Sequence, residues 1–261
     1  AANPHPSERH LFSIDLPDVS ELPGYSPCYP KALTNLRQGG WHEVSFDPKG
    51  AYYLLSRQSP QDVPTHRVLG IDNQDFELTL EDNRDLARVS SAFVMPSSVY
   101  YNITINGTII SVRESRPHDF DATGRSRYPV LVNVYGGPNS QMVQQKWQRT
   151  NWHDYLACEM GYLVVTIDGR GTGFRGREYR NPITSKFGTY EALDVTEAAG
   201  QVARLPYVDE KRIGVWGWSF GGYLTSKLIE RDSGIFNLGM SVAPVTSWRF
   251  YDSIYTERYM K

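Results

Sequence analysis

From residue 128 onward, apolar strands alternate with amphipathic helices along the chain. Continuous apolar runs predict strands at 129–135, 162–168, 212–216 and 238–245. Helical periodicity predicts helices at 144–160, 190–205 and 220–231. Strands that are apolar on both faces and alternate with helices are typical of a parallel sheet covered on both sides. This part of the chain is therefore predicted to be α/β.

The earlier part of the chain has a different pattern, in which short strands are separated by turn residues. Strands are predicted at 10–15, 44–46, 51–55 and 66–71, and a further hairpin at 100–112 has Asn106-Gly107 at its tip. Short strands of this kind are typical of sandwiches, barrels or propeller blades, and no internal repeat decides among them. The change of pattern predicts a boundary near residue 95.

Composition places the chain among ordinary globular proteins and excludes several classes. The 261 residues carry a formal net charge of −2, which argues against nucleic acid or an anionic membrane as the main partner. Cys28 and Cys158 provide neither a disulfide framework nor a metal-ligand spacing, and no metal or cofactor is expected. Asn102 and Asn106 each begin an N-glycosylation acceptor sequence, which favours a secreted or lumenal protein.

The most informative local sequence is the G-x-S-x-G pattern at 217–221, placed between a predicted strand and a predicted helix. In a tight strand-turn-helix connection, glycines on both sides of Ser219 would avoid collisions and project its hydroxyl outward. The backbone N–H of Phe220 would then lie at the helix start, where it can donate to a developing oxyanion. The alternative is a glycine-rich helix entry in which Ser219 is only a cap.

Tyr135 ends a predicted strand two α/β units earlier and is followed by Gly136-Gly137-Pro138. Hydrolases with this architecture place a second oxyanion donor at this point, and a tyrosine could supply its hydroxyl. An ordinary strand-end aromatic is the alternative.

A second glycine pattern, G-x-G-x-x-G at 171–176, follows the strand that ends at Asp168. A dinucleotide site would need a helix opening within this loop, but Asn181-Pro182 interrupts and the next helical pattern begins near Tyr190. A structural loop is the preferred interpretation.

No histidine follows Ser219 in the sequence, where the catalytic base of an α/β hydrolase is expected. α/β hydrolases place a histidine after the nucleophile, whereas His5, His10, His42, His66, His118 and His153 all precede Ser219. A serine without a base is a poor nucleophile, so the chain either is not a hydrolase, uses an unusual order or stops before the triad is complete. The last of these is the preferred hypothesis.

Several long segments closely resemble the dipeptidyl peptidase IV branch of the prolyl oligopeptidase family, and most of all its fungal dipeptidyl aminopeptidases. These segments are 215–223 and 241–260, with support from 134–138 and 168–173. The resemblance implies a β-propeller end at 1–95 and the first part of an α/β-hydrolase domain at 96–261. It also implies that the triad Asp and His lie beyond Lys261 and the amino-terminus-binding glutamates before Ala1, so that the 261 residues alone would be inactive.

By the same resemblance, Ser219 is the nucleophile, and Tyr135 with the Phe220 amide forms the oxyanion hole. The pocket for a penultimate Pro or Ala would be lined by Val245, Trp248, Tyr251 and Tyr255. Aromatic walls suit a flat apolar ring, although ordinary core packing would also account for these side chains. Phe220 replaces the family's usual tyrosine, which leaves the amide role intact but removes a hydroxyl from the pocket edge.

The function implied is a serine exopeptidase that releases X-Pro or X-Ala dipeptides through an acyl-enzyme. A catalytically inactive accessory relative and another hydrolase of the prolyl oligopeptidase type are the alternatives. The partners expected are peptides with a penultimate Pro or Ala and a second copy in a homodimer, without nucleic acid. The expected location is the lumenal side of a vacuolar or Golgi membrane, through an anchor outside this chain, or outside the cell.

Overall fold

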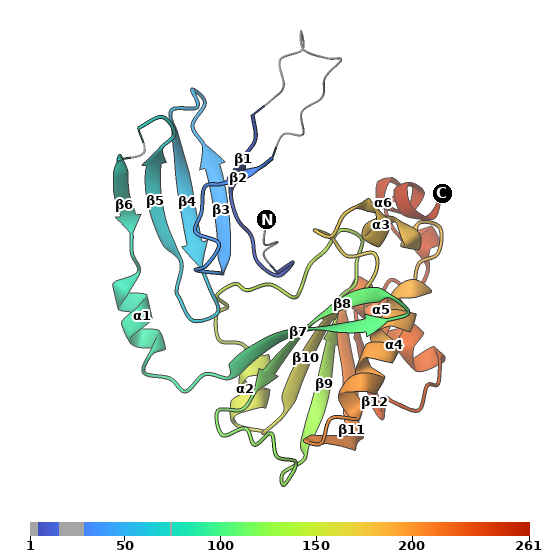
Figure 1. Cartoon of the computed structure of the whole chain (residues 1–261). Helices are drawn as coiled ribbons and strands as arrows, with labels where there is room; N and C mark the ends of the chain where they lie inside the picture. The colour runs from blue at the N-terminus through green and yellow to red at the C-terminus, as the bar shows by residue number, and fades with distance from the viewer. Residues whose placement is uncertain (1–4, 16–28, 74) are drawn as a thin grey trace. The chain divides into compact units, whose positions relative to one another are not determined.

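The computed structural model describes residues 5–15, 29–73 and 75–261, which form two compact units (Figure 1). The first unit comprises residues 1–93 together with 144–149. The second comprises residues 94–143 together with 150–261. Cys28, one of the two cysteines of the sequence, lies outside the described residues.

The first unit contains a four-stranded antiparallel sheet in which consecutive strands are neighbours. Its strands are β3 (Trp41–Phe46), β4 (Tyr52–Gln58), β5 (Thr65–Gly70) and β6 (Glu77–Glu81). The Asp47 carboxylate shapes the β3–β4 turn, because it accepts hydrogen bonds from the backbone N–H groups of Lys49 at 3.0 Å and Tyr52 at 2.8 Å. The hairpin predicted at this turn is confirmed.

Three smaller elements complete the first unit. The strands β1 (Phe12–Ser13) and β2 (Lys31–Ala32) pair antiparallel, so the strand predicted at 10–15 is only two residues long. Helix α1 (Arg84–Ser90) has no buried residue, which leaves the sheet as the main site of apolar burial in this unit.

The second unit contains a six-stranded sheet in the order β12-β11-β9-β10-β8-β7 (Figure 1). The strands are β7 (Ser97–Ile105), β8 (Thr108–Arg116), β9 (Tyr128–Val134), β10 (Leu163–Asp168), β11 (Val208–Trp218) and β12 (Leu238–Val242). The last four are parallel, whereas β7 and β8 form the antiparallel hairpin predicted around Asn106-Gly107. A mixed sheet of this order fits an α/β-hydrolase fold.

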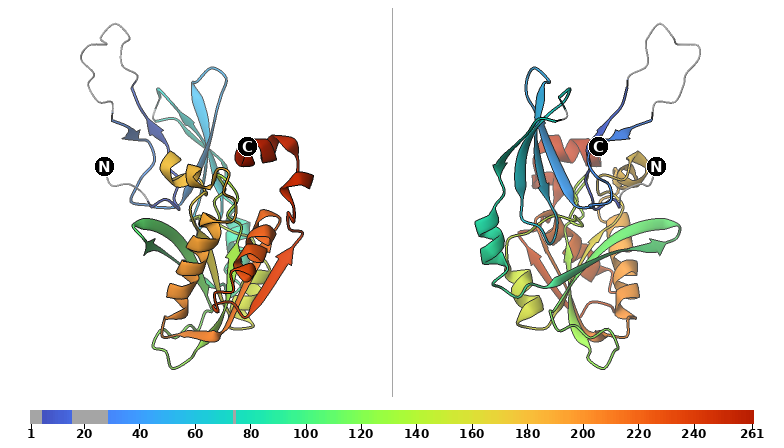
Figure 2. Two further views of the ribbon diagram at one scale, coloured as in Figure 1. Left: turned by 90° about the vertical axis from the view of Figure 1, so that its right-hand side faces the viewer. Right: turned by 60° about the vertical axis from the view of Figure 1, so that its left-hand side comes forward.

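Helices cover both faces of this sheet. The helices packed on its strands are α2 (Trp152–Cys158), α4 (Tyr190–Ala203) and α5 (Phe220–Glu230), and the second unit also contains α3 (Arg177–Arg180) and α6 (Ser253–Met260). Figure 2 shows α2, in yellow-green, and α4, in orange, on opposite sides of the sheet. Among the described helices, none has the length and apolar character needed to cross a membrane.

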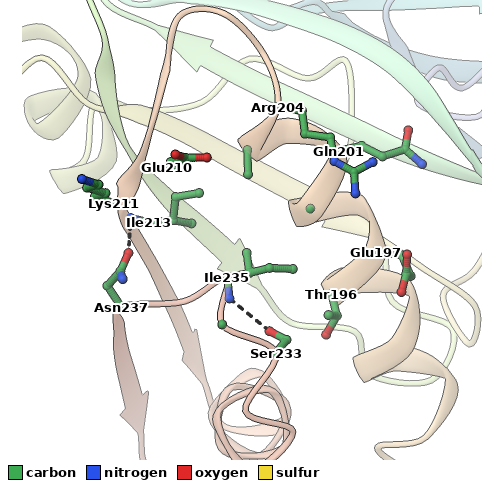
Figure 3. A pocket seen from close by; sticks show the side chains of 13 residues that line it. Thr196, Glu197, Gln201, Arg204, Glu210, Lys211, Ile213, Ser233, Ile235 and Asn237 are labelled. Carbon is green, nitrogen blue, oxygen red and sulfur yellow. Dashed lines mark hydrogen bonds between the residues drawn. The ribbon is translucent and has the colours of Figure 1, made fainter.

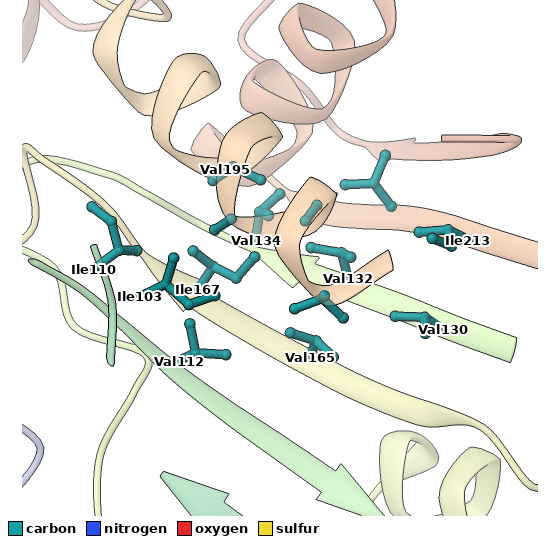
Figure 4. Close-up of a cluster of buried hydrophobic side chains, with 14 of the residues drawn as sticks. Ile103, Ile110, Val112, Val130, Val132, Val134, Val165, Ile167, Val195 and Ile213 are labelled. Carbon is teal, nitrogen blue, oxygen red and sulfur yellow. The ribbon is translucent and has the colours of Figure 1, made fainter. Parts of the chain in front are cut away.

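The main core lies between the sheet and α4 (Figure 4). Val130, Val132 and Val134 of β9 pack there with Val165 and Val195, each at most 2% exposed. Burying a valine side chain stabilises a fold by roughly 1.5–3 kcal/mol, so this layer holds the strand ends firmly in register. The polar side chains at the ends of these strands are therefore held in fixed positions.

The sequence predicted one helix incorrectly. The expected helix at 144–160 is confined to Trp152–Cys158, and residues 144–149 belong to the first unit. Asn151 caps the start of α2, because its side chain accepts a hydrogen bond from the His153 N–H at 2.8 Å while Asp154 accepts one from the Asn151 N–H at 2.9 Å. This reciprocal cap fixes the helix start that periodicity alone placed too early.

Two other boundaries also differ from expectation. A single helical turn, α3, opens directly after Gly176, where the sequence predicted no helix before Tyr190, and a 3-10 turn at Asn181–Ile183 ends it. The strand predicted to reach residue 245 stops at Val242, because Ala243 adopts a positive φ of 42°.

Candidate active site

Ser219 occupies the turn between β11 and α5. Its backbone has φ 59° and ψ −115°, a conformation that residues with side chains rarely adopt. The neighbouring strand holds the turn, because the Ser219 N–H donates to the Val242 carbonyl at 2.9 Å. Strain of this kind in a strand-to-helix turn is the property that presents a nucleophilic serine to substrate.

Two glycines make the turn sterically feasible. A Cβ on Gly217 would overlap the backbone of Gly221, and a Cβ on Gly221 would overlap the Val134 carbonyl oxygen. These neighbours are backbone atoms, so they could move aside only by displacing the strand or the helix. The steric reason inferred from the G-x-S-x-G pattern is therefore confirmed at both glycines.

The end of β9 packs against the first turn of α5 beside Ser219. Tyr135 directly follows β9, and a Cβ on Gly221 would lie 3.1 Å from the Tyr135 Cα. The Phe220 amide is the first of α5, and the first amides of a helix have no intrahelical acceptor. The structure thus brings a phenol and a helix N-terminal amide to the same turn.

The Tyr135 hydroxyl is in a state that can donate a hydrogen bond. Burial raises the pKa of Tyr135, and the nearby Tyr251 hydroxyl raises it further. The phenol therefore stays protonated at neutral pH, as an oxyanion donor must.

Aromatic rings form a cluster next to this turn. Trp248 and Tyr255 stack with their ring centroids 5.9 Å apart, and Tyr251 meets both rings edge-on at 5.7 and 5.2 Å. Phe220 joins the cluster through its contact with Trp248 at 5.7 Å and with Tyr135 at 6.2 Å. The structure therefore brings together every aromatic residue that the sequence analysis assigned to the pocket or the oxyanion hole.

Val245 is the remaining residue that the resemblance assigns to the pocket. It lies half-buried in the loop between β12 and Trp248, and the apolar cluster defined by the described residues does not include it. The assignment of Val245 to the pocket remains a prediction.

The sequence analysis assigned no site role to four aromatic residues of this cluster. They are Phe187, Tyr190, Tyr223 and Tyr259. Tyr223 lies four residues after Ser219 and Tyr259 four residues after Tyr255, so helical spacing could have found them. Phe187 lies in a loop before α4, and no local sequence pattern predicts that it belongs to the cluster.

Phe187 is the buried centre of the cluster. It is 7% exposed and contacts Trp248 at 4.8 Å, Phe220 at 5.2 Å and Tyr259 at 5.8 Å between ring centroids. Its carbonyl accepts a hydrogen bond from the Tyr223 hydroxyl at 3.0 Å. One loop residue thus joins three separate segments of the cluster.

Phe187→Ala is therefore expected to lower the free energy of unfolding by about 3–5 kcal/mol, because it removes a buried ring and leaves a cavity. Denaturant unfolding of the whole protein measures this loss. Phe250, which is 92% exposed, provides the matched control, and Phe250→Ala is expected to change stability by less than about 0.5 kcal/mol. Equal effects of the two substitutions would show that Phe187 does not organise the cluster.

Among the described residues, no histidine is hydrogen-bonded to Ser219, and the Ser219 side chain makes no cap hydrogen bond to α5. His153, on α2, has a packing role instead, because its ring lies against Trp216 with the ring centroids 5.3 Å apart. Burial lowers the pKa of His153 to about 4, so this imidazole is neutral and serves packing.

The described residues contain no group of three or more side chains suited to hold a metal ion. The G-x-G-x-x-G loop leads into α3, a helix of only four residues, so it lacks the long helix on which a dinucleotide pyrophosphate would rest.

A polar cavity of about 660 Å³ lies between α4, the start of β11 and the segment before β12 (Figure 3). Ser219 lies at the opposite, carboxyl end of β11, so this cavity is separate from the site.

The acceptor residues Asn102 and Asn106 are both exposed on the β7–β8 hairpin. Asn106 lies at the turn with φ 48°, whereas the Asn102 side chain accepts a hydrogen bond from Ser111 at 3.3 Å. Their use as glycosylation sites remains a prediction.

Comparisons with known proteins find a matching family and similar sequences. The family described as the prolyl oligopeptidase family matches residues 147–261. The chain is 46% identical over 258 residues to a probable dipeptidyl-aminopeptidase B of Aspergillus terreus, covering 98% of this chain and 27% of that protein. It is 43% identical to the dipeptidyl-aminopeptidase B of Aspergillus niger, covering the same shares.

A solved structure agrees with these sequence relatives. The chain superposes on dipeptidyl peptidase 4 of Porphyromonas gingivalis with a TM-score of 0.84 and 36% identity, covering 98% of this chain and 34% of that one. The resemblance to the dipeptidyl peptidase branch of the prolyl oligopeptidase family is confirmed. The chain spans about a quarter of the length of the curated relatives that it matches.

Proposed function

We propose that the whole protein is a serine dipeptidyl peptidase that releases X-Pro or X-Ala dipeptides from the amino termini of polypeptides. The observation that carries this proposal is the strained turn at Ser219, which shares Phe220 and Tyr135 with a cluster of aromatic rings. A nucleophile beside a rigid apolar surface suits a substrate whose residue before the cleaved bond is flat and uncharged. The names of the relatives support the same reaction.

In the proposed acylation step, the Ser219 oxygen attacks the carbonyl carbon of the second substrate residue. A C–O bond forms, the serine proton passes to a general base, and the carbonyl oxygen becomes an oxyanion. The Tyr135 hydroxyl and the Phe220 N–H donate to this oxyanion. The C–N bond then breaks as the base returns the proton to the leaving amine, and water later releases the dipeptide from Ser219 by the reverse sequence.

The general base is proposed to come from a part of the whole protein outside this chain. None of the described histidines is hydrogen-bonded to Ser219, although a nucleophilic serine needs a base within reach.

The proposed substrate pocket lies among Trp248, Tyr251 and Tyr255. A pyrrolidine ring can pack against these rings without leaving a polar group unpaired, whereas a charged side chain would be desolvated there. The hydroxyls of Tyr135, Tyr251 and Tyr255 lie close enough to influence one another, because each of the other two raises the pKa of Tyr255. These hydroxyls provide the polar groups beside an otherwise apolar surface.

A set of dipeptide p-nitroanilides tests this proposal on the whole protein. We expect Gly-Pro and Gly-Ala substrates to be hydrolysed and Gly-Leu and Gly-Glu substrates to be poor, because the latter two need a larger or a polar pocket. N-acetylated Gly-Pro-p-nitroanilide separates an exopeptidase from the alternative hydrolases of the family. Rapid turnover of the acetylated substrate would favour those alternatives, and no turnover of any substrate would favour the inactive accessory relative.

We propose that the first unit is the end of a β-propeller and that the peptidase domain begins near residue 96. The antiparallel sheet of β3, β4, β5 and β6, in which each strand neighbours the next, supports this proposal because it has the form of one propeller blade.

We also propose that the protein is a lumenal or secreted glycoprotein, held to a vacuolar or Golgi membrane by an anchor outside this chain and paired as a homodimer. The exposure of Asn102 and Asn106 supports the glycosylation. Treatment with an N-glycosidase is expected to lower the apparent mass of the protein from its native source. The Asn102→Gln, Asn106→Gln double variant should show a smaller loss of mass on the same treatment. A loss of mass equal to that of the unmodified protein would place the glycans elsewhere.

A further inference from the structure

The glycine-rich loop at 169–173 lies against the loop that follows Tyr135. The Asn139 N–H donates to the Gly171 carbonyl at 2.9 Å, and the Gly173 N–H donates to the Ser140 carbonyl at 2.8 Å. A Cβ on Gly173 would lie 2.7 Å from the Asn139 carbonyl oxygen, so only glycine permits this contact. The pattern that suggested a nucleotide site instead provides a surface for another loop.

Asp168 holds the far end of the loop that follows Tyr135, at Met142 and Val143. Its carboxylate accepts hydrogen bonds from the backbone N–H groups of Val143 at 2.7 Å and Met142 at 2.9 Å. The residue is 3% exposed. Burial raises the pKa of Asp168 to about 6, against the lowering effect of the two N–H donors, so the carboxylate is ionised at neutral pH. Charge-assisted hydrogen bonds of this kind are stronger than neutral ones.

The near end of the loop contacts the Tyr135 ring. A Cβ on Gly137 would lie 2.7 Å from the ring carbon Cε1 of Tyr135. The Ser140 hydroxyl donates to the Gly137 carbonyl at 2.6 Å, which ties the middle of the loop to this contact. A continuous set of contacts therefore runs from Asp168 through the loop to the Tyr135 ring.

We propose that Asp168 is a positioning residue, which acts with the Gly171 and Gly173 backbone to hold the loop at 137–143 and thereby aims the Tyr135 hydroxyl at the oxyanion. The inference rests on the proposed function, because it assigns Tyr135 to that role. Loss of the carboxylate loosens the loop, and the phenol no longer reaches the position that the oxyanion occupies in the transition state. Substrate binding in the ground state does not depend on this hydroxyl.

Steady-state kinetics of the whole protein with Gly-Pro-p-nitroanilide tests the inference through a double-mutant cycle of Asp168→Asn and Tyr135→Phe. Asparagine keeps the shape of the side chain but presents an amide in place of the charged acceptor. We expect Asp168→Asn to lower kcat by between about 10-fold and 100-fold, because small misplacement of a catalytic group has effects of this size. KM should change less than about twofold, since the lost interaction belongs to the transition state.

The coupling between the two sites distinguishes positioning from general damage. In the Tyr135→Phe background, Asp168→Asn is expected to change kcat by less than about twofold, because no hydroxyl remains to be misplaced. Glu114 is a matched control, as a carboxylate buried elsewhere in the sheet and paired with Arg116 at 2.7 Å. Glu114→Gln should lower thermal stability, and its effect on kcat should be the same with and without the Tyr135 hydroxyl.

A second pair of variants applies where Asp168→Asn does not fold. Gly173→Ala is expected to displace the Asn139 carbonyl and lower kcat in the same coupled manner. Gly214→Ala is the control, because a Cβ there meets nothing closer than 3.7 Å. Additive effects with Tyr135→Phe, or a kcat unchanged by both Asp168→Asn and Gly173→Ala, would overturn the inference. Turnover that survives Ser219→Ala would instead overturn the proposed function, so the two failures are distinguishable.

Discussion

Replacing Ser219 with alanine is expected to abolish hydrolysis of Gly-Pro-p-nitroanilide by the whole protein. The substitution removes the attacking oxygen, and loss of a serine nucleophile lowers kcat by on the order of 10⁶-fold in a well-studied serine protease. Folding should be preserved, because the Ser219 side chain makes no cap hydrogen bond to α5. The measurement is steady-state turnover together with a thermal melt.

Ser233→Ala provides the control for this experiment. Ser233 lies in the segment after α5, away from the turn at Ser219, and its hydroxyl accepts only a long 3.4 Å hydrogen bond from the Ile235 N–H among the interactions described. Its turnover should stay within about twofold of the unmodified protein, as surface substitutions generally have small effects. Persistent activity in Ser219→Ala would exclude this residue as the nucleophile.

Tyr135→Phe is expected to have the second largest effect, a fall in kcat of about 100-fold to 1,000-fold with little change in KM. Removal of one oxyanion-hole donor has an effect of this size, and the interaction strengthens only as charge develops on the carbonyl oxygen. The ring itself remains, so its contact with Phe220 at 6.2 Å is retained. Kinetics with the same p-nitroanilide separate the kcat effect from any change in KM.

Tyr155→Phe is the matched control for the lost hydroxyl, because Tyr155 is 57% exposed on α2. Its kcat should remain within about twofold of the unmodified protein. A fall in kcat that is equal for Tyr135→Phe and Tyr155→Phe, or a rise in KM in place of a fall in kcat, would contradict the oxyanion role.

Local sequence patterns predicted most of the fold of the second unit correctly. Fully apolar strands such as β9 and β10 are unambiguous, because a run that is buried on both faces needs no partner information to be recognised. The G-x-S-x-G turn was also predictable, since the close approach of Gly217 and Gly221 is imposed by neighbours in sequence and by the adjoining strand. Short-range geometry determined these features.

Features that depend on distant contacts were not predictable. The helix expected from residue 144 begins at Trp152, because residues 144–149 pack with the first unit and the Asn151 cap sets the start. Phe187 becomes central to the aromatic cluster only when three segments far apart in sequence meet. The partnership of Asp168 with the Met142 and Val143 amides likewise spans some 25 residues, beyond any local pattern.

Peptide mapping after covalent labelling tests most directly the claim that Ser219 is the nucleophile. The whole protein is incubated with a fluorophosphonate, which reacts with activated serines, and the labelled peptide is identified by mass spectrometry. We predict one label per chain, located on Ser219, with loss of Gly-Pro-p-nitroanilide hydrolysis in proportion to labelling. Inactivation with the label on another residue, or full labelling of Ser219 with activity retained, would contradict the account.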